Sequence, residues 1–259
     1  MEEYLDFAKS IALYAGKVML EGYNKNVDQG FKEDRTVVTT VDKSINKYLI
    51  DKVKEKYPEH SVIGEEESYK TDSKYVWVCD PLDGTGMYVN HIPVFVFSLA
   101  LVYDGEPIVG VVYNAVEDKM YTAIKDKGAY CNNKQIFVNN KNYGDLGYRT
   151  NVEIFNNKLI DEVSLIQELK KNSKISSIGS VARSSMAVAS GDFSADIFPG
   201  SEHGNCDIAA SSIIVKEAGG KVTNFYGEEQ RYDESIKGAI ISNGISHEKM
   251  LQKVKKYMK

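Results

Sequence analysis

The chain alternates between segments with apolar residues at helical spacing and short apolar runs typical of strands. Residues 2–22 have helical spacing and predict a first helix. A second helix is predicted after residues 39–42, with Ile45, Leu49 and Val53 on its inner face. The polar segment between these helices, residues 29–35, predicts a loop.

Runs rich in Val, Ile, Phe and Tyr predict the strands of the first half. They are residues 61–63, 75–79, 94–102, 108–113 and 120–124, followed by a turn-rich strand pair within 128–140. The turns between the central runs predict an antiparallel meander. In the second half, helices and strands alternate. Helices are predicted around 159–169, 180–191, 207–219 and after Ser246, and strands at 175–178, 195–198 and 239–241.

A polar segment with two glycines, residues 139–147, marks a candidate domain boundary. We therefore expect an N-terminal α+β part over residues 1–143 with a mixed sheet. A C-terminal α/β part is expected over residues 144–259.

Composition and charge narrow the class of protein. The 259 residues are 42% hydrophobic and 27% charged, with a net charge of −5, which gives no electrostatic case for nucleic acid binding. No long apolar span predicts a membrane helix or a signal peptide. Cys79, Cys131 and Cys206 lie far apart and form no metal or redox motif. A reduced, cytoplasmic protein is the simplest interpretation.

The strongest candidate chemistry lies at residues 80–85, the sequence D-P-L-D-G-T, directly after the predicted strand 75–79. Pro81 and Gly84 are expected to break the strand and form a tight turn. Carboxylates as close as Asp80 and Asp83 require a cation or a shared proton, and oxygen ligands suit Mg²⁺. Backbone N–H groups of Gly84 and Thr85 would cradle a phosphate.

Two other interpretations apply to this hexapeptide. In one, Asp80 and Asp83 only cap backbone groups of an Asx turn. In the other, the motif is that of an aspartyl-phosphate phosphatase of the haloacid dehalogenase type. That motif needs two aspartates separated by one residue, and Pro81 occupies the nucleophile position, so a covalent mechanism is excluded.

Acids elsewhere also have a structural and a functional interpretation. Asp42 and Asp207 each begin a predicted helix, where an N-cap or first-turn acid is common. Glu65 follows a predicted strand in a run of acids typical of a solvated loop. Strand-end loops are also where α/β folds place ligands, so all three are candidates for the site.

Taken together, the motifs resemble the inositol monophosphatase family of Mg²⁺-dependent, lithium-sensitive phosphomonoesterases. They are G-E-E at 64–66, D-P-L-D-G-T at 80–85, D-I-A-A at 207–210 and E-A-G-G at 217–220. The resemblance runs nearly end to end, is densest from 38 to 132 and weakest from 141 to 174. It implies an α/β (α+β) fold, the layered αβαβα sandwich of the inositol monophosphatase and fructose-1,6-bisphosphatase type.

The resemblance also implies roles for residues. The metal ligands would be Glu65, Asp80, the carbonyl of Leu82, Asp83 and Asp207, holding two to three Mg²⁺ ions. Most of these ligands lie in the N-terminal part, and the C-terminal part would supply Asp207 and the substrate loop. Thr85, paired with Asp42, would orient a metal-bound water, and Glu65 is the third catalytic residue that the resemblance implies. A third, weaker Mg²⁺ would lie near Glu65. Gly84 and Thr85 would donate backbone N–H groups to the phosphate.

The substrate end of the pattern is altered. Inositol-specific members carry a glutamate where this chain has Gly200, with Glu202 nearby as a candidate substrate ligand. A Gly-Ser-Ala element at the substrate appears as Gly179-Ser180-Val181, which makes Ser180 a candidate contact. Arg183 either contacts a second anionic group of the substrate or is an exposed helix residue.

The resulting prediction is a hydrolase that cleaves a small phosphate monoester by direct attack of a metal-activated water. The alternatives within the superfamily are fructose 1,6-bisphosphate, histidinol phosphate and 3′-phosphoadenosine 5′-phosphate as substrates. A non-catalytic phosphometabolite-binding protein is the alternative of another class, and a homodimer is expected from the family. Asp83→Asn is expected to abolish turnover with little loss of stability.

Overall fold

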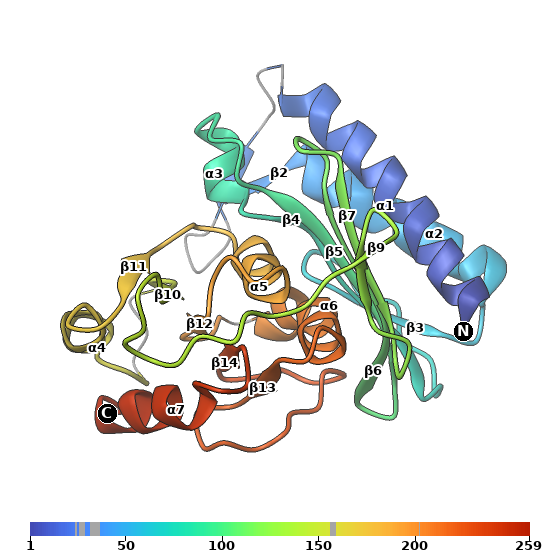
Figure 1. Ribbon diagram of the computed structural model, residues 1–259. Helices are drawn as coiled ribbons and strands as arrows, with labels where there is room; N and C mark the ends of the chain where they lie inside the picture. Colours follow the sequence, from blue (N-terminus) through green and yellow to red (C-terminus); the bar gives the residue numbers. More distant parts are fainter. Residues whose placement is uncertain (24, 26–28, 32–36, 156–158, 202) are drawn as a thin grey trace.

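The chain folds into five alternating layers of helices and sheets, seen edge-on in Figure 1. This computed structural model describes residues 1–23, 25, 29–31, 37–155, 159–201 and 203–259. The helices are α1 (Glu2–Tyr23), α2 (Thr40–Lys56), α3 (Thr85–Val89), α4 (Glu162–Leu169), α5 (Val181–Ala189), α6 (Gly204–Glu217) and α7 (His247–Lys256). The predicted αβαβα sandwich is confirmed.

The larger sheet has the strand order β3-β4-β5-β6-β7-β8-β9. Its strands are β3 (Ser61–Gly64), β4 (Tyr75–Asp83), β5 (Val96–Tyr103), β6 (Glu106–Asn114), β7 (Lys119–Ile124), β8 (Ala129–Cys131) and β9 (Lys134–Gln135). β3 and β4 are parallel, and the other neighbours are antiparallel, so the predicted meander is confirmed. α1 and α2 cover one face, where Ile11 and Leu49 pack with Trp77 and Leu99.

The smaller sheet has the order β11-β10-β12-β14-β13. Its strands are β10 (Arg149–Val152), β11 (Lys174–Ser176), β12 (Ala195–Phe198), β13 (Lys221–Thr223) and β14 (Ala239–Ser242). β10 is parallel to β11 and β12, whereas β14 is antiparallel to β12 and β13. α4 and α7 cover its outer face, where Leu165 and Leu251 pack with Ile197 and Ile240.

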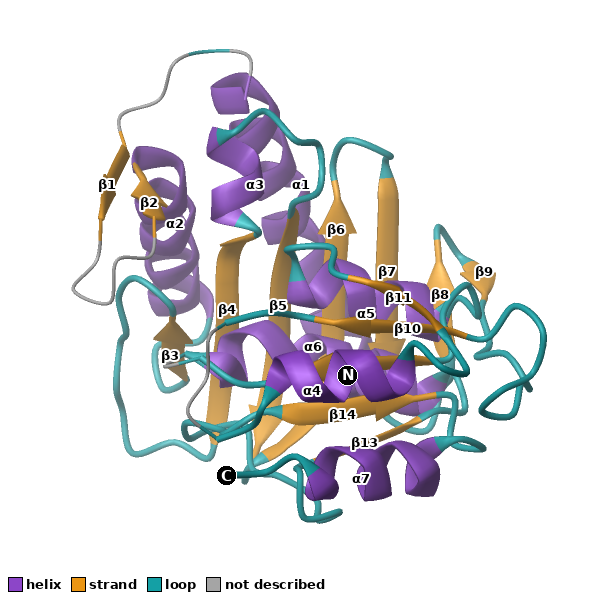
Figure 2. Cartoon of the chain, turned by 90° about the vertical axis from the view of Figure 1, so that its left-hand side faces the viewer, coloured by secondary structure: helices purple, strands orange, loops and turns teal. Residues whose placement is uncertain are grey.

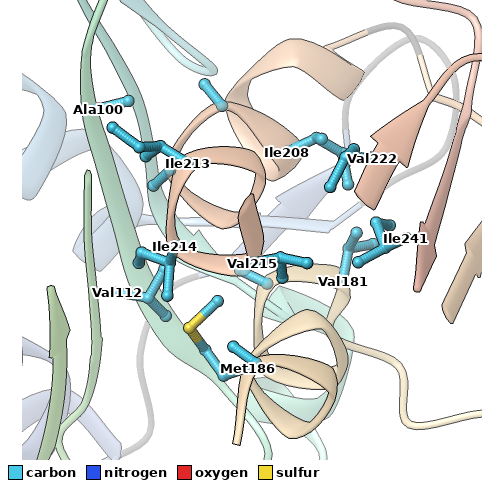
Figure 3. Close-up of a cluster of buried hydrophobic side chains, with 14 of the residues drawn as sticks. Ala100, Val112, Val181, Met186, Ile208, Ile213, Ile214, Val215, Val222 and Ile241 are labelled. Carbon is cyan, nitrogen blue, oxygen red and sulfur yellow. The ribbon is translucent and has the colours of Figure 1, made fainter. Parts of the chain in front are cut away.

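Helices α5 and α6 fill the layer between the two sheets. In Figure 2 the strands of the smaller sheet cross in front of those of the larger sheet. Figure 3 shows the packing of this layer: Ile213 and Ile214 of α6 face Ala100 and Val112 of the larger sheet. Ile208 of α6 points to the other side, beside Val222 of the smaller sheet. This apolar layer fixes the two halves against each other, because hydrophobic burial and close packing provide the main stabilisation.

The prediction that β4 stops before the hexapeptide is wrong. β4 continues to Asp83, with a register irregularity against β5 between Asp80 and Asp83. A β-bulge tolerates Pro81 because the bulged residue need not donate to the ladder. The bulge turns this strand end, and α3 begins directly after Gly84.

Other differences concern short or polar elements. Residues 29–31 form strand β1 (Gln29–Phe31), paired with β2 (Val37–Thr39), where a loop was predicted. The rest of that predicted loop, residues 32–35, lies outside the described residues. β10 and β13 were not predicted, because they contain too few apolar residues to show a strand pattern. The division at residue 143 stays a prediction, and it falls in the connection between β9 and β10. None of the helices in the described part of the chain is long and apolar enough to span a membrane.

Close packing of β6 on α6 yields a stability prediction. A Cβ atom on Gly110 would lie 2.5 Å from Ile213 Cγ2 and 2.9 Å from the Ala210 carbonyl oxygen. Gly110→Ala should therefore lower the free energy of unfolding by about 1–3 kcal/mol in chemical denaturation. Gly86→Ala is the control, because a Cβ there meets nothing within 4 Å. Equal stability of the two variants would contradict this packing.

Candidate active site

The end of β4 presents buried carboxylates on a strand that is held on both sides. Asp80 and Asp83 are 2% and 6% exposed, and Leu82 between them is fully buried. The Leu82 N–H donates to Asp80 Oδ1 at 2.9 Å. This hydrogen bond within the bulge fixes the Asp80 side chain. Asp80 and Asp83 both line the same cavity, as the hexapeptide motif predicted.

A third carboxylate comes from the other half of the chain. Asp207 lies in the first turn of α6 and is 9% exposed, and Ser201 Oγ donates to its Oδ2 at 3.1 Å. Oxygen atoms of Asp80, Asp83 and Asp207 all lie within 4.8 Å of one another. Among the described residues, this is the cluster of potential metal-binding side chains.

The cluster is electrostatically unfavourable without a cation. Burial raises the pKa of Asp80 well above its usual value, and the charges of Glu65, Asp83 and Asp207 raise it further. Burial and the neighbouring Asp83 and Glu65 raise the pKa of Asp207 in the same way. A hard divalent cation such as Mg²⁺ fits this site, because it binds carboxylate and carbonyl oxygens and removes the repulsion.

Asp83 also holds the start of α5. Its carboxylate accepts hydrogen bonds from Ser180 Oγ at 2.6 Å, Ala182 N–H at 2.7 Å and Val181 N–H at 3.1 Å. Burial raises the pKa of Asp83 to about 6, although these hydrogen bonds act in the opposite direction. Because it satisfies otherwise free N–H groups at a helix start, Asp83 has a structural role that the sequence did not suggest.

Asp42 lies behind Thr85. It belongs to a capping box at the start of α2, where Thr39 is the N-cap, so the structural interpretation of this residue is correct as far as it goes. Asp42 Oδ2 accepts from Thr39, and Asp42 Oδ1 is 3.1 Å from Thr85 Oγ1. The same Thr85 Oγ1 is 2.9 Å from the Leu82 carbonyl oxygen. Burial raises the pKa of Asp42 to about 6. The Asp42 side chain thus caps the start of α2 and also holds Thr85, which lines the site.

These residues surround one cavity of about 440 Å³. Its lining includes Glu65, Asp80, Leu82, Asp83, Gly84, Thr85, Ser180 and Asp207, together with Val37, Met87, Glu153, Ile154, Phe155, Ser201 and His203. Gly84 has a positive φ of 92°, and a Cβ there would lie 2.6 Å from the Val94 carbonyl oxygen and 3.1 Å from Ser180 Cβ. Only glycine fits this point, where the α3 turn meets the segment before α5.

Of the predicted substrate residues, Arg183 is absent from the described lining of the cavity and Glu202 lies outside the described residues. Arg183 forms an ion pair with Glu117 at 3.0 Å. Ser180 does line the cavity, but its hydroxyl donates to Asp83. Gly200 has a φ of 107°, and a Cβ there would lie 2.9 Å from the Gly238 nitrogen, so no side chain fits at this position.

Glu153 is a charged lining residue that the sequence did not predict. It follows β10, is 2% exposed and accepts hydrogen bonds from the N–H groups of Ile178 and Gly179. No motif marks it, since it lies in the segment where the family resemblance is weakest. Its proximity to the site shows in Asp83, whose pKa is raised mainly by burial and also by the charge of Glu153.

Comparison with known proteins decides the family. The model of the inositol monophosphatase family matches residues 1–259. The chain belongs to the inositol monophosphatase family. It is thus a phosphatase, a phosphoric monoester hydrolase, of a family in which Mg²⁺ is the typical cofactor.

Three similar proteins support this assignment. The fructose-1,6-bisphosphatase/inositol-1-monophosphatase of Aquifex aeolicus is 35% identical over 100% of this chain and 97% of that protein. The Thermotoga maritima IMPase structure has a TM-score of 0.88 at 26% identity, covering 98% of this chain and 97% of that one. An IMPase/NADP phosphatase complexed with Mg²⁺ and phosphate has a TM-score of 0.82 at 27% identity, covering 100% and 97%.

One element of the inositol monophosphatase signature lies outside the site. Glu217, at the end of α6, accepts hydrogen bonds from the N–H groups of Asp126, Lys127 and Gly128 at 2.8, 3.1 and 2.7 Å. These groups form the turn between β7 and β8. This part of the signature therefore fixes α6 to the larger sheet rather than binding a ligand.

The hydrogen bonds of Asp83 change the expected stability of its variant. At pH 8 without Mg²⁺, Asp80→Asn should raise the melting temperature, because it removes a buried, repelled charge and disturbs one N–H contact. Asp83→Asn removes a similar charge but disrupts three hydrogen bonds, so it should melt below Asp80→Asn. Thermal unfolding of both variants checks this order. A higher melting temperature for Asp83→Asn would show that the cap contributes nothing.

Proposed function

We propose that this chain hydrolyses a phosphate monoester of a small hydroxyl-bearing metabolite by direct attack of water, without a phosphoenzyme. The observation that carries the proposal is that the cluster of Asp80, Asp83 and Asp207 lines one cavity with Thr85. Thr85 is hydrogen-bonded to Asp42 behind it. Anionic substrates approach such a cluster only when cations neutralise it, which links the site to phosphate chemistry.

The proposed metal ligands follow the family pattern. Glu65, Asp80 and the Leu82 carbonyl would hold one Mg²⁺, and Asp80, Asp83 and Asp207 a second. A third ion near Glu65 completes the proposed range of two to three. When bound, these ions would neutralise the phosphate, lower the pKa of the attacking water and stabilise the leaving oxygen.

Thr85 and Asp42 would position the attacking water. When Thr85 donates its proton to Asp42 Oδ1, the lone pairs of its hydroxyl are free to accept a proton from water. Asp42 is held by the N–H and hydroxyl of Thr39, so Thr85 donates to a fixed acceptor. Glu65, at the end of β3, lines the same cavity and would act on the same water as a base.

The phosphate itself would lie at Gly84 and Thr85. Gly84 has a left-handed conformation directly before α3, and both Gly84 and Thr85 line the cavity, where their backbone N–H groups would face the phosphate. Such groups bind phosphate oxygens without a side-chain charge. Ser180 would act indirectly in this scheme by holding Asp83 in place.

Several properties are carried over from the family as part of this proposal. They are inhibition by lithium, a homodimeric state and a cytoplasmic location. Fructose 1,6-bisphosphate is the second candidate substrate, favoured by the name of the Aquifex aeolicus relative. The absence of a side chain at Gly200 argues against a specific inositol contact from that position.

Substitution of Thr85 tests the proposed role of its hydroxyl. Thr85→Ala should lower kcat at saturating Mg²⁺ by about 10²-fold or more, since the water loses its proton acceptor. Thr85→Ser keeps the hydroxyl and should retain most of the activity. Steady-state kinetics of both variants, with Mg²⁺ titrated, separates this effect from metal loss. Full activity of Thr85→Ala would contradict the role.

A substrate panel tests the function as a whole. The panel consists of inositol 1-phosphate, fructose 1,6-bisphosphate, histidinol phosphate and 3′-phosphoadenosine 5′-phosphate. We expect phosphate release from at least one of them to require Mg²⁺. Excess Li⁺ should inhibit it, and Ca²⁺ should too, because the larger ion does not hold the octahedral geometry. Failure of the whole panel with Mg²⁺ would favour the non-catalytic binding protein.

A further inference from the structure

Glu153 occupies a set of hydrogen-bond donors that would otherwise bind an anion. Its Oε1 accepts from Asn151 Nδ2 at 2.8 Å, Gly179 N–H at 3.1 Å and Ile178 N–H at 3.2 Å. Its Oε2 accepts from Gly179 N–H at 3.1 Å and Ser177 Oγ at 3.4 Å. Successive backbone N–H groups with a hydroxyl and an amide form an anion-binding concavity. Here the protein's own carboxylate fills it.

This filled concavity lies beside the proposed phosphate position. Glu153, Ser177 and Gly179 all line the catalytic cavity. A Cβ on Gly84 would lie 3.3 Å from the Gly179 carbonyl oxygen, so the two segments are in contact. A leaving group that extends from a phosphate at Gly84 along the Gly179 segment would reach Glu153.

Hydrogen-bond capacity distinguishes the two oxygens of Glu153. Oε1 already accepts from three donors, whereas Oε2 shares the Gly179 N–H and accepts one long bond from Ser177. A carboxylate offers about four acceptor sites, which the contacts of Glu153 already fill, so a further donor would replace the long bond from Ser177 to Oε2. A substrate hydroxyl can supply that donor. A second phosphate cannot, and its charge would be repelled.

We propose that Glu153 determines substrate specificity: it selects a neutral, hydroxyl-bearing leaving group and excludes substrates with a second phosphate on that side of the cavity. The inference rests on the proposed function and deepens it, since it names the substrate class. It also explains how a carboxylate reaches the leaving group although Gly200 carries no side chain.

A matched substrate pair tests the selection. Fructose 1-phosphate and fructose 1,6-bisphosphate differ only in the second phosphate, and kcat/KM is measured for release of the 1-phosphate. Wild type should prefer the monophosphate. Glu153→Ala, which empties the concavity, should raise the bisphosphate-to-monophosphate ratio by at least about tenfold. Glu153→Gln, which removes only the charge, should raise it less.

Asp196→Asn is the control. Asp196 is fully buried, accepts from the same Asn151 amide at 2.9 Å and does not line the cavity. Its variant should leave the ratio within about twofold of wild type, because it changes the network but not the cavity charge. A merely structural Glu153 would lower both kcat/KM values together. An unchanged ratio in both Glu153 variants, or a wild type that prefers the bisphosphate, overturns the proposal.

A binding experiment keeps the proposal testable if neither fructose phosphate is cleaved. With EDTA present, sulfate should raise the melting temperature of Glu153→Ala and not that of wild type or Asp196→Asn, since a ligand of the native state stabilises it. If wild type cleaves neither fructose phosphate but sulfate stabilises Glu153→Ala, the result counts against the proposed function and not against the concavity. Failure of sulfate to stabilise Glu153→Ala would count against the anion-binding concavity.

Discussion

Repulsion between buried carboxylates is the constraint around which this structure is arranged. Asp80, Asp83 and Asp207 approach within 4.8 Å, and burial alone already disfavours their charges. Each is held by donors from a different part of the chain: the β4 bulge, the start of α5 and Ser201. The five layers therefore converge on a point where the carboxylates repel one another until a proton or a cation neutralises them.

A second group of buried acids is surrounded by hydrogen-bond donors, although burial and the charge of Glu153 still raise the pKa of Asp196 to about 7. Glu153 and Asp196 are 2% and 0% exposed and are bridged by the side-chain amide of Asn151. Ser184 and Ser185 donate to Asp196. Here donors outnumber the charged oxygens that need them. The catalytic cluster has fewer donors for its oxygens, and this difference separates a metal site from a structural network.

The sequence predicted the layers because apolar periodicity reports burial. It failed where polar residues are buried. β10 was not predicted because Thr150 and Asn151 are polar, yet both are fully buried. Hydrogen bonds to other side chains satisfy their polar groups. The strand break predicted at Pro81 was wrong because a bulge accommodates proline. The cluster of Asp80, Asp83 and Asp207 followed from the motifs, whereas no local signal connects Asp83 with Ser180, which donates to it.

Substrate specificity is harder to predict from the sequence than the catalytic chemistry, because it depends on contacts between distant segments. Metal ligands need fixed residue types at fixed places, so they leave motifs in the sequence. A leaving group needs only the right charge and hydrogen-bond capacity at one wall of the cavity, and different segments can provide it. In this chain the backbone at Gly200 packs on Gly238 too closely for any side chain. Glu153 carries the charge instead, and only the fold brings it into the same cavity as Gly84.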